Sequence, residues 1–177
     1  MKNLKKTIVM LLAVVAISFT TACSSDDDGN GGGSNGSGEY VRAKIDGTSW
    51  SASTSFDTTG GTLSTNGGIT ILAVQGSDED GKAINFSIIN YDGPGTYTTG
   101  DSMTNTNLIQ YVTISPVAGW ASNVATSVVG GLTPGSITVS SDDNGVVEGT
   151  FSFDGYNADD MTTKVFTEGE FRANLDN

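Results

Sequence analysis

Hydrophobic and polar residues alternate along most of the chain beyond residue 38, which is the pattern of half-buried β-strands. In residues 40–45, for example, Val41, Ala43 and Ile45 fall on one face and the intervening residues on the other. No part of this region sustains the 3.6-residue period of an amphipathic helix. Runs rich in Val, Ile, Thr and aromatic residues predict further strands over 68–75, 82–91, 108–115, 136–141, 146–153 and 165–175.

This spacing predicts an all-β domain over 39–177, an antiparallel β-sandwich or β-barrel of roughly 8–11 short strands. The first turn, Asp46-Gly47, is a pair that tolerates the positive φ angles of a type I′ hairpin. A two-residue loop there would place Ala43 opposite Trp50 and Val41 opposite Ala52. All four side chains then face the core.

A second hairpin turns at the Asp-Asp-Asn-Gly segment that ends at Gly145. A two-residue loop would mix apolar and polar faces. A three-residue loop with Gly145 in the left-handed conformation places Val139 opposite Gly149 and Ile137 opposite Phe151. We therefore expect the three-residue loop, with a bulge at Gly145.

The first 22 residues have the layout of a secretory signal peptide, three lysines followed by an apolar run from Thr7 to Phe19. The run would form a helix of about 20 Å, too short for a hydrocarbon core of about 30 Å. It leads into Thr20-Thr21-Ala22-Cys23, which resembles the lipobox cut by the lipoprotein signal peptidase, with Thr20 where Leu is usual. We expect cleavage before Cys23 and anchoring by several acyl chains on that residue.

The segment from 23 to 38 reads as a lipidated cysteine followed by a flexible linker, because residues 24–38 are only Ser, Asp, Gly and Asn. The five residues after Cys23 resemble the acidic export signal that sends Bacteroidota lipoproteins to the outer face of the outer membrane: Ser24, Ser25, Asp26, Asp27 and Asp28. A solvated acidic linker is the alternative. The export reading predicts an outer-membrane protein facing the cell exterior.

Charge and composition exclude several classes of partner and chemistry. Without the signal peptide, five Lys and Arg remain against twenty Asp and Glu, a balance of −15. Such a surface repels nucleic acid. The chain has no His, which excludes Ser-His-Asp and Cys-His catalysis and His-ligated zinc. We expect no disulfide, no metal, no cofactor and a monomer.

Carboxylates remain as chemical groups, because paired Asp and Glu can cleave glycosides. Those considered lie mostly in turns, where solvation is the simpler use: Asp78, Glu79, Asp80, Asp92, Asp101, Asp142, Asp143, Glu148, Asp159 and Asp160. Two of these clusters, 78–81 and 142–145, invite comparison with calcium loops. Neither has the ligand spacing of an EF-hand, so hairpin turns are expected instead.

Aromatic side chains could stack on sugars, and Trp120, in the loop-like stretch 116–121, is the more exposed of the two tryptophans on this interpretation. Trp50 is expected in the core, and core packing is the simpler role for both. Asp57-Thr58-Thr59 and Asp101-Ser102-Met103 resemble the O-glycosylation signal of Bacteroidota envelope proteins, with Thr58 and Ser102 as acceptors.

Residues 40–52, Tyr-Val-Arg-Ala-Lys-Ile-Asp-Gly-Thr-Ser-Trp-Ser-Ala, are followed by Gly95-Thr96-Tyr97, by 149–153 and by Gly169-Glu170-Phe171. Together these motifs resemble an uncharacterised domain-of-unknown-function family of Bacteroidota (Flavobacteriia-type) lipoproteins, over residues 39–175. The resemblance implies location and fold class and supplies no active-site residues. The sequence favours a non-enzymatic surface module that binds a glycan or an envelope protein, with a carboxylate-dependent glycoside-active enzyme and a lipocalin-like carrier as alternatives.

Overall fold

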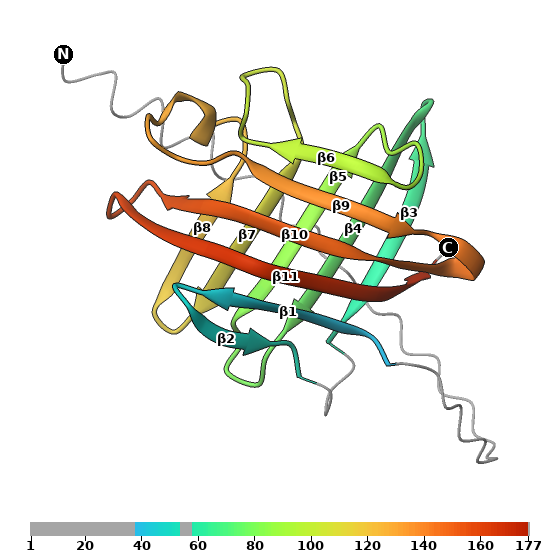
Figure 1. Cartoon of the computed structure of the whole chain (residues 1–177), viewed down its shortest axis with the longest axis horizontal. Coiled ribbons are helices and arrows are strands. Elements are labelled where there is room, and N and C mark those ends of the chain that lie inside the picture. The colour runs from blue at the N-terminus through green and yellow to red at the C-terminus, as the bar shows by residue number, and fades with distance from the viewer. Residues whose placement is uncertain (1–37, 54–57, 177) are drawn as a thin grey trace. The chain divides into compact units, whose positions relative to one another are not determined.

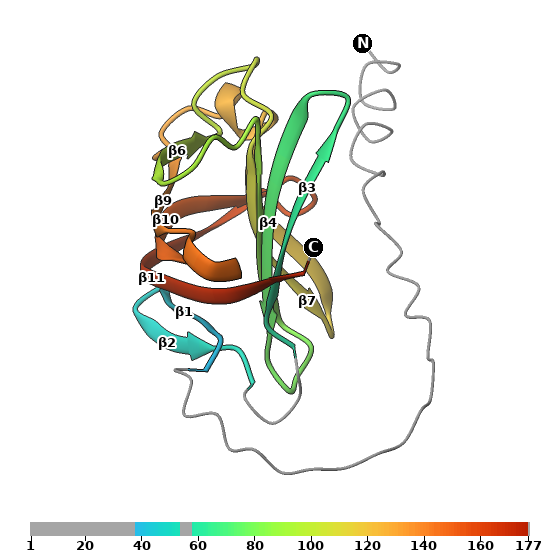
Figure 2. The same ribbon diagram turned by 90° about the vertical axis from the view of Figure 1, so that its right-hand side faces the viewer.

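Two layers of β-strands make up the part of the chain that the computed structural model describes, residues 38–53 and 58–176. The layer in front in Figure 1 contains, in order, β2 (Thr48–Ser51), β1 (Tyr40–Ile45), β11 (Thr162–Asp176), β10 (Val146–Asn157), β9 (Gly135–Ser141) and β6 (Gly95–Thr99). The back layer contains β3 (Gly60–Asn66), β4 (Ile69–Ser77), β5 (Ala83–Ile89), β7 (Leu108–Ile114) and β8 (Val117–Ser122). Front strands cross the back strands, and the layers stand apart in the edge view (Figures 1 and 2).

The two layers are joined at two corners, so the all-β fold is a sandwich that closes on itself like a barrel. At one corner Leu175 and Asp176 of β11 pair in parallel with β3, and at the other Tyr156 of β10 pairs with Ala121 of β8. Apart from the β11–β3 pair, all strand pairs in the described chain are antiparallel. Strands β10 and β11 each pair with three others: β10 with β8, β9 and β11, and β11 with β1, β3 and β10.

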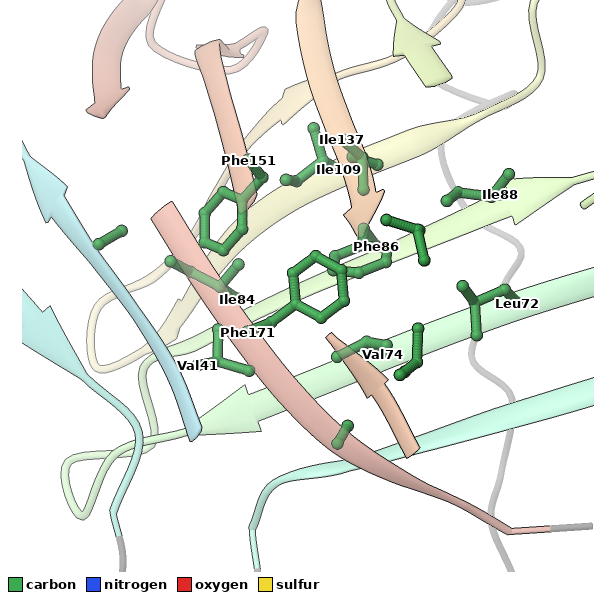
Figure 3. Close-up of a cluster of buried hydrophobic side chains, with 14 of the residues drawn as sticks. Val41, Leu72, Val74, Ile84, Phe86, Ile88, Ile109, Ile137, Phe151 and Phe171 are labelled. Atoms are coloured by element: carbon green, nitrogen blue, oxygen red, sulfur yellow. The ribbon is translucent and has the colours of Figure 1, made fainter. Parts of the chain in front are cut away.

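Side chains from both layers fill the space between them (Figure 3). The ring of Phe86 on β5 meets that of Phe171 on β11 edge to face, with centroids 4.9 Å apart. Phe153 and Phe166 stack in parallel at 4.0 Å. The fully buried large side chains in this interior include Leu72, Ile84, Ile88, Ile109 and Ile137.

The register predicted for the first hairpin is confirmed, and that predicted for the second is confirmed from Gly149 onward but not next to the turn, where Ser141 lies opposite Glu148. Ala43 lies opposite Trp50, and the turn residues Asp46 and Gly47 have φ angles of 50° and 81°. In the second hairpin Gly149 lies opposite Val139, and Gly145 is left-handed with φ 74°.

Phe151 also lies opposite Ile137 as expected, but the bulge expected at Gly145 is not there. The turn forms a 3₁₀ segment, η3 (Asp143–Gly145), with Asn144 left-handed as well. The register shift lies between Glu148 and Gly149 instead. Two successive left-handed residues complete the turn, and the extra residue is absorbed within the ladder.

The sequence prediction missed three strands and made two others too short. The missed strands are β3, β6 and β8, and all three are rich in Gly, Ala, Ser and Thr rather than in large apolar residues. Strand β10 continues to Asn157 and β11 already begins at Thr162. A second short 3₁₀ segment, η2 (Thr126–Val128), lies between β8 and β9.

Candidate functional site

The predicted site residues fall in different parts of the molecule. Cys23 and the acidic segment 24–28 lie outside the described residues. Trp120 lies in strand β8 and not in a loop, a correction to the sequence prediction. The small residues around it, which resemble a loop in sequence, allow β8 to pair closely with β7.

Trp120 belongs to an aromatic cluster at one end of the sandwich. Its ring lies 5.9 Å from that of Tyr111, which in turn meets Trp50 edge to face at 6.3 Å. The Lys164 ammonium lies 4.8 Å from the centre of the Trp120 ring, and the indole N–H donates to the Thr162 hydroxyl. The ring is half-buried against the core, so its contacts are those of a packed side chain.

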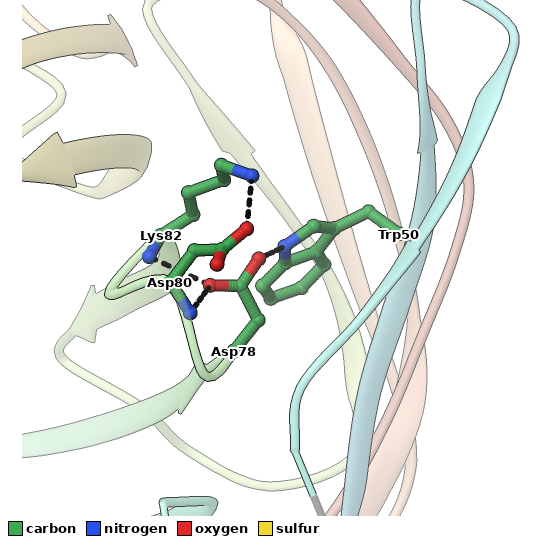
Figure 4. Close-up of polar contacts among 4 residues, drawn as sticks. All are labelled: Trp50, Asp78, Asp80 and Lys82. Carbon is green, nitrogen blue, oxygen red and sulfur yellow. Dashed lines mark hydrogen bonds and ion pairs between the residues drawn. The ribbon is translucent and has the colours of Figure 1, made fainter. Parts of the chain in front are cut away.

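Trp50 closes the same end through the β4–β5 turn (Figure 4). Its indole N–H donates to Asp78 Oδ2 at 2.8 Å, and Asp78 Oδ1 accepts the backbone N–H groups of Asp80 and Lys82. The Lys82 ammonium pairs with Asp80, and this contact lowers the pKa of the Asp80 carboxyl. Asp78 therefore organises a turn and holds a tryptophan.

Several other carboxylates considered from the sequence accept hydrogen bonds from hydroxyl groups of the protein. Asp92 accepts from the Tyr97 hydroxyl, Asp142 from the Tyr91 hydroxyl and Asp160 from Thr162. The described residues contain no group of three carboxylate-type ligands that could hold a metal ion.

The two hydroxyls proposed as glycosylation acceptors differ in their surroundings. Thr58 is half-buried, and its hydroxyl lies within hydrogen-bond distance of the carbonyl oxygens of Ser53 and Ser77. Ser102 lies in the β6–β7 loop beside Met103, which is 72% exposed. Thr98 and Asn105 donate to the Asp101 carboxylate, which lowers its pKa. Ser102 is itself half-buried, and its hydroxyl lies 3.3 Å from that of Thr104.

A row of polar side chains crosses the front layer on its outer surface, away from the back layer. In register across five strands it contains, in order, Thr96, Thr138, Thr150, Glu170 and Arg42. A second, shorter row contains Thr98, Ser136 and Ser152. We call the surface formed by the outward residues of β6, β9, β10, β11 and β1 the polar face.

A β-bulge interrupts this surface where β10 meets β11. The register shifts between Phe151 and Phe153, and Glu168 on the opposite strand has a left-handed φ of 51°. Left-handed backbone is costly for a residue with a side chain, and bulges re-aim side chains and are common beside functional sites. Gly169 follows, buried where an added Cβ would lie 2.4 Å from the carbonyl oxygen of Phe151.

Two adjoining depressions lie on the polar face at and beside this bulge. The first has a volume of about 350 Å³, and its polar lining includes Ser136, Thr150, Ser152, Glu168 and Glu170. The second has a volume of about 200 Å³. They share Thr150 and Glu170, and the second extends towards Tyr40 and Glu148.

Along one side of these depressions, the lining carboxylates Glu148, Glu168 and Glu170 belong to ion pairs. These ion pairs join Arg42 to Glu170, Lys44 to Glu168 at 2.8 Å, and Arg172 to Glu148. Three cations therefore balance three carboxylates on this surface, whereas the chain as a whole has a net charge of −12. Glu168 and Glu170 were not among the carboxylates considered from the sequence.

The other side carries hydroxyl groups, three of which have no hydrogen-bond partner in the described chain. Thr96 and Thr138 hydrogen-bond to each other at 2.9 Å. Within the described chain, no protein group hydrogen-bonds to the hydroxyls of Ser136, Thr150 or Ser152. Free hydroxyls each offer one donor and two acceptor positions, and these three line the first depression.

Comparison with known proteins identifies a family and no individual relative. The family model described as "Domain of unknown function (DUF6252)" matches residues 38–173. Neither a curated protein nor a solved structure matches the chain. No helix in the described residues is long and apolar enough to cross a membrane.

Proposed function

We propose that this chain, which belongs to the DUF6252 family, is a lipid-anchored binding module of the bacterial outer membrane that takes its ligand on the polar face. Cys23 carries the anchor, and the linker 24–38 separates the domain from the membrane. The acidic residues 26–28 direct the protein to the cell exterior. The ligand is a glycan or an envelope protein.

One observation carries the choice of the polar face. The bulge, the left-handed Glu168 and the two depressions coincide at the β10–β11 junction. Strained backbone persists where the surrounding structure enforces it, and such positions cluster at functional sites. A binding role explains why strain, free hydroxyls and a hollow occur together.

The described carboxylates favour binding over catalysis. Glycoside cleavage needs an acid and a second carboxylate on opposite sides of the scissile bond. Glu168 and Glu170, which line the first depression, come from one strand, and each pairs with a cation. The filled interior (Figure 3) likewise argues against an apolar carrier, which requires a cavity inside the barrel.

Hydrogen exchange measured by mass spectrometry tests this proposal. The mature lipoprotein in detergent is incubated with a soluble envelope extract of the producing bacterium. We expect slower exchange in β9, β10 and β11, and loss of that protection in Ser152→Gln, which fills the first depression. Protection confined to other strands, or none, would show that the polar face is not a binding surface.

A further inference from the structure

We infer that the ligand of the polar face is an uncharged glycan chain lying across strands β9, β10 and β11. This inference rests on the proposed function and specifies its ligand. Three observations support it: the hydroxyl rows, the pairing of every cation of the polar face with a carboxylate, and the scarcity of exposed apolar side chains in the depressions.

The hydroxyl rows provide a repeating set of hydrogen-bonding groups. Thr138 and Thr150 lie side by side on adjacent strands, and neighbouring strands are about 4.8 Å apart. Ser136 and Ser152 repeat the arrangement two residues along each strand. Hydroxyls that both donate and accept match the hydroxyls of a sugar, which do the same.

Charge selects against ionic ligands. The three cations of this surface already pair with carboxylates, and the other two cations of the described chain, Lys82 and Lys164, pair with Asp80 and Asp46. A polyanion would therefore meet no free cation and a net negative protein. A polycation would have to compete with Arg42, Lys44 and Arg172 for carboxylates.

The depressions expose few of the apolar groups on which protein partners depend, since Phe151, which lines the first, is only 4% exposed. The core of a protein–protein interface is typically enriched in aromatic and other apolar side chains. No large exposed hydrophobic side chain of the described chain lines a depression, although Val165 is an outward residue of β11. These side chains are Ile69, Met103, Ile114, Val117, Val128, Met161 and Val165. Tyr40, at the far end of the second depression, has the Arg42 guanidinium 4.9 Å from its ring centre. A neutral polyhydroxylated chain suits such a surface better than a protein.

The test treats the same envelope extract in two ways before it is added to the mature lipoprotein. Periodate cleaves vicinal diols of sugars, and protease removes proteins. We expect protection of β9, β10 and β11 to survive protease and to disappear after periodate. Protection lost after protease and retained after periodate would overturn the glycan and keep the proposed binding face. No protection before treatment would overturn both.

Charge is tested by separating the polysaccharide fraction of that extract on an anion-exchange column. We expect the unbound neutral pool to protect the polar face, with little change when the salt concentration is raised. Protection by the acidic pool alone, lost at high salt, would overturn the inference.

A matched pair of double variants tests the hydroxyl row. Thr138→Val with Thr150→Val removes two adjacent hydroxyls from the polar face. Thr65→Val with Thr70→Val removes a second cross-strand threonine pair, 3.0 Å apart on the β3–β4 hairpin. We expect at least a tenfold weaker affinity for the neutral pool in the first variant only, with the same melting temperature in both. Equal affinity in the two variants would contradict the inference.

Discussion

Gly149 and Gly119 are both strand glycines, but only Gly149 has no space for a side chain. An added Cβ at Gly149 would lie 2.0 Å from the Thr138 carbonyl oxygen and 2.9 Å from the Phe171 ring. At Gly119 the nearest atom, on Val112, would be 3.7 Å away. The close approach of β9 and β10 over the core therefore depends on Gly149 having no Cβ atom.

We predict that Gly149→Ala lowers the free energy of unfolding by about 1–3 kcal/mol or more, because overpacking forces the strands apart. Gly119→Ala should change it by no more than about 0.5 kcal/mol. Urea denaturation of both variants measures the difference. Equal stability would mean that β9 can move away from β10 without cost.

Three tyrosines make stability sensitive to alkaline pH. Burial raises the pKa of Tyr91, and its hydrogen bond to Asp142 raises the pKa further. Burial also raises the pKa of Tyr97 and of Tyr111. Unfolded tyrosines lose their protons near about pH 10, so above that pH the unfolded chain binds fewer protons than the folded one.

The free energy of unfolding should therefore be unaffected by these tyrosines below about pH 10 and should fall as pH rises above it. Replacing Tyr91 with Phe removes one of the three groups and should make this fall shallower. Denaturation measured across that range, with tyrosinate absorbance, provides the check. A fall of the same slope in Tyr91→Phe would show that Tyr91 is not responsible.

At the scale of strands, the bulge in β11 gives two neighbouring glutamates opposite backbone requirements. Glu168 is left-handed, whereas Glu170 pairs regularly with both Arg42 and Thr150. Both carboxylates form exposed ion pairs, which contribute only about 0–1 kcal/mol each. The backbone should therefore decide the effect of glycine at each position.

We predict that Glu168→Gly stabilises the protein by up to about 1 kcal/mol, since glycine adopts the left-handed conformation without strain. Glu170→Gly should destabilise it by about 0.5–1 kcal/mol, because glycine weakens a regular strand. Thermal unfolding of the pair gives the comparison. A loss of stability in both variants would show that the bulge does not strain Glu168.

The sequence predicted the fold class and, except next to the second turn, the hairpin registers, because those depend on neighbouring strands and turn residues. It missed β8, where Ala118, Gly119 and Ala121 hide the alternation that Trp120 would otherwise reveal. It also missed the polar face, since serine and threonine are ordinary strand residues. The depression arises only when β9, β10 and β11 are in register around a bulge, which no local pattern encodes.

At the scale of the whole protein, the proposed function depends on how the domain is attached and presented. With the proposed cleavage before Cys23 the charge would be −15, which would repel anionic surfaces. Residues 24–38 are only Ser, Asp, Gly and Asn, the composition that the proposed function assigns to a tether. A tethered domain of this kind can turn the polar face towards ligands outside the membrane.

We predict that Cys23→Ala leaves an unprocessed precursor without lipid, since in the proposed lipoprotein a diacylglyceryl group would be attached to that thiol before cleavage. Ser24→Ala, one residue along, should be cleaved and acylated normally. Labelling with radioactive palmitate and gel mobility distinguish the two. Normal processing of Cys23→Ala would contradict the lipoprotein assignment.

We further predict that protease added to intact cells removes the domain, and that replacing Asp26, Asp27 and Asp28 with Ser protects it. The acidic run would then be an export signal and not simply part of a linker. Equal cleavage of both proteins would favour the linker.

The position of β11 at the junction of the two layers also governs when the protein can fold. This strand follows in sequence every strand it pairs with, and its bonds reach back as far as Glu39, 135 residues earlier. Neither the β1 ladder nor the corner with β3 can be completed until β11 has been made. Folds that depend on such distant pairings form slowly. A chain that folds slowly stays unfolded for longer, and an unfolded chain can pass through a narrow channel. In the proposed export, the late closing strand would thus keep the chain unfolded until it has crossed the inner membrane.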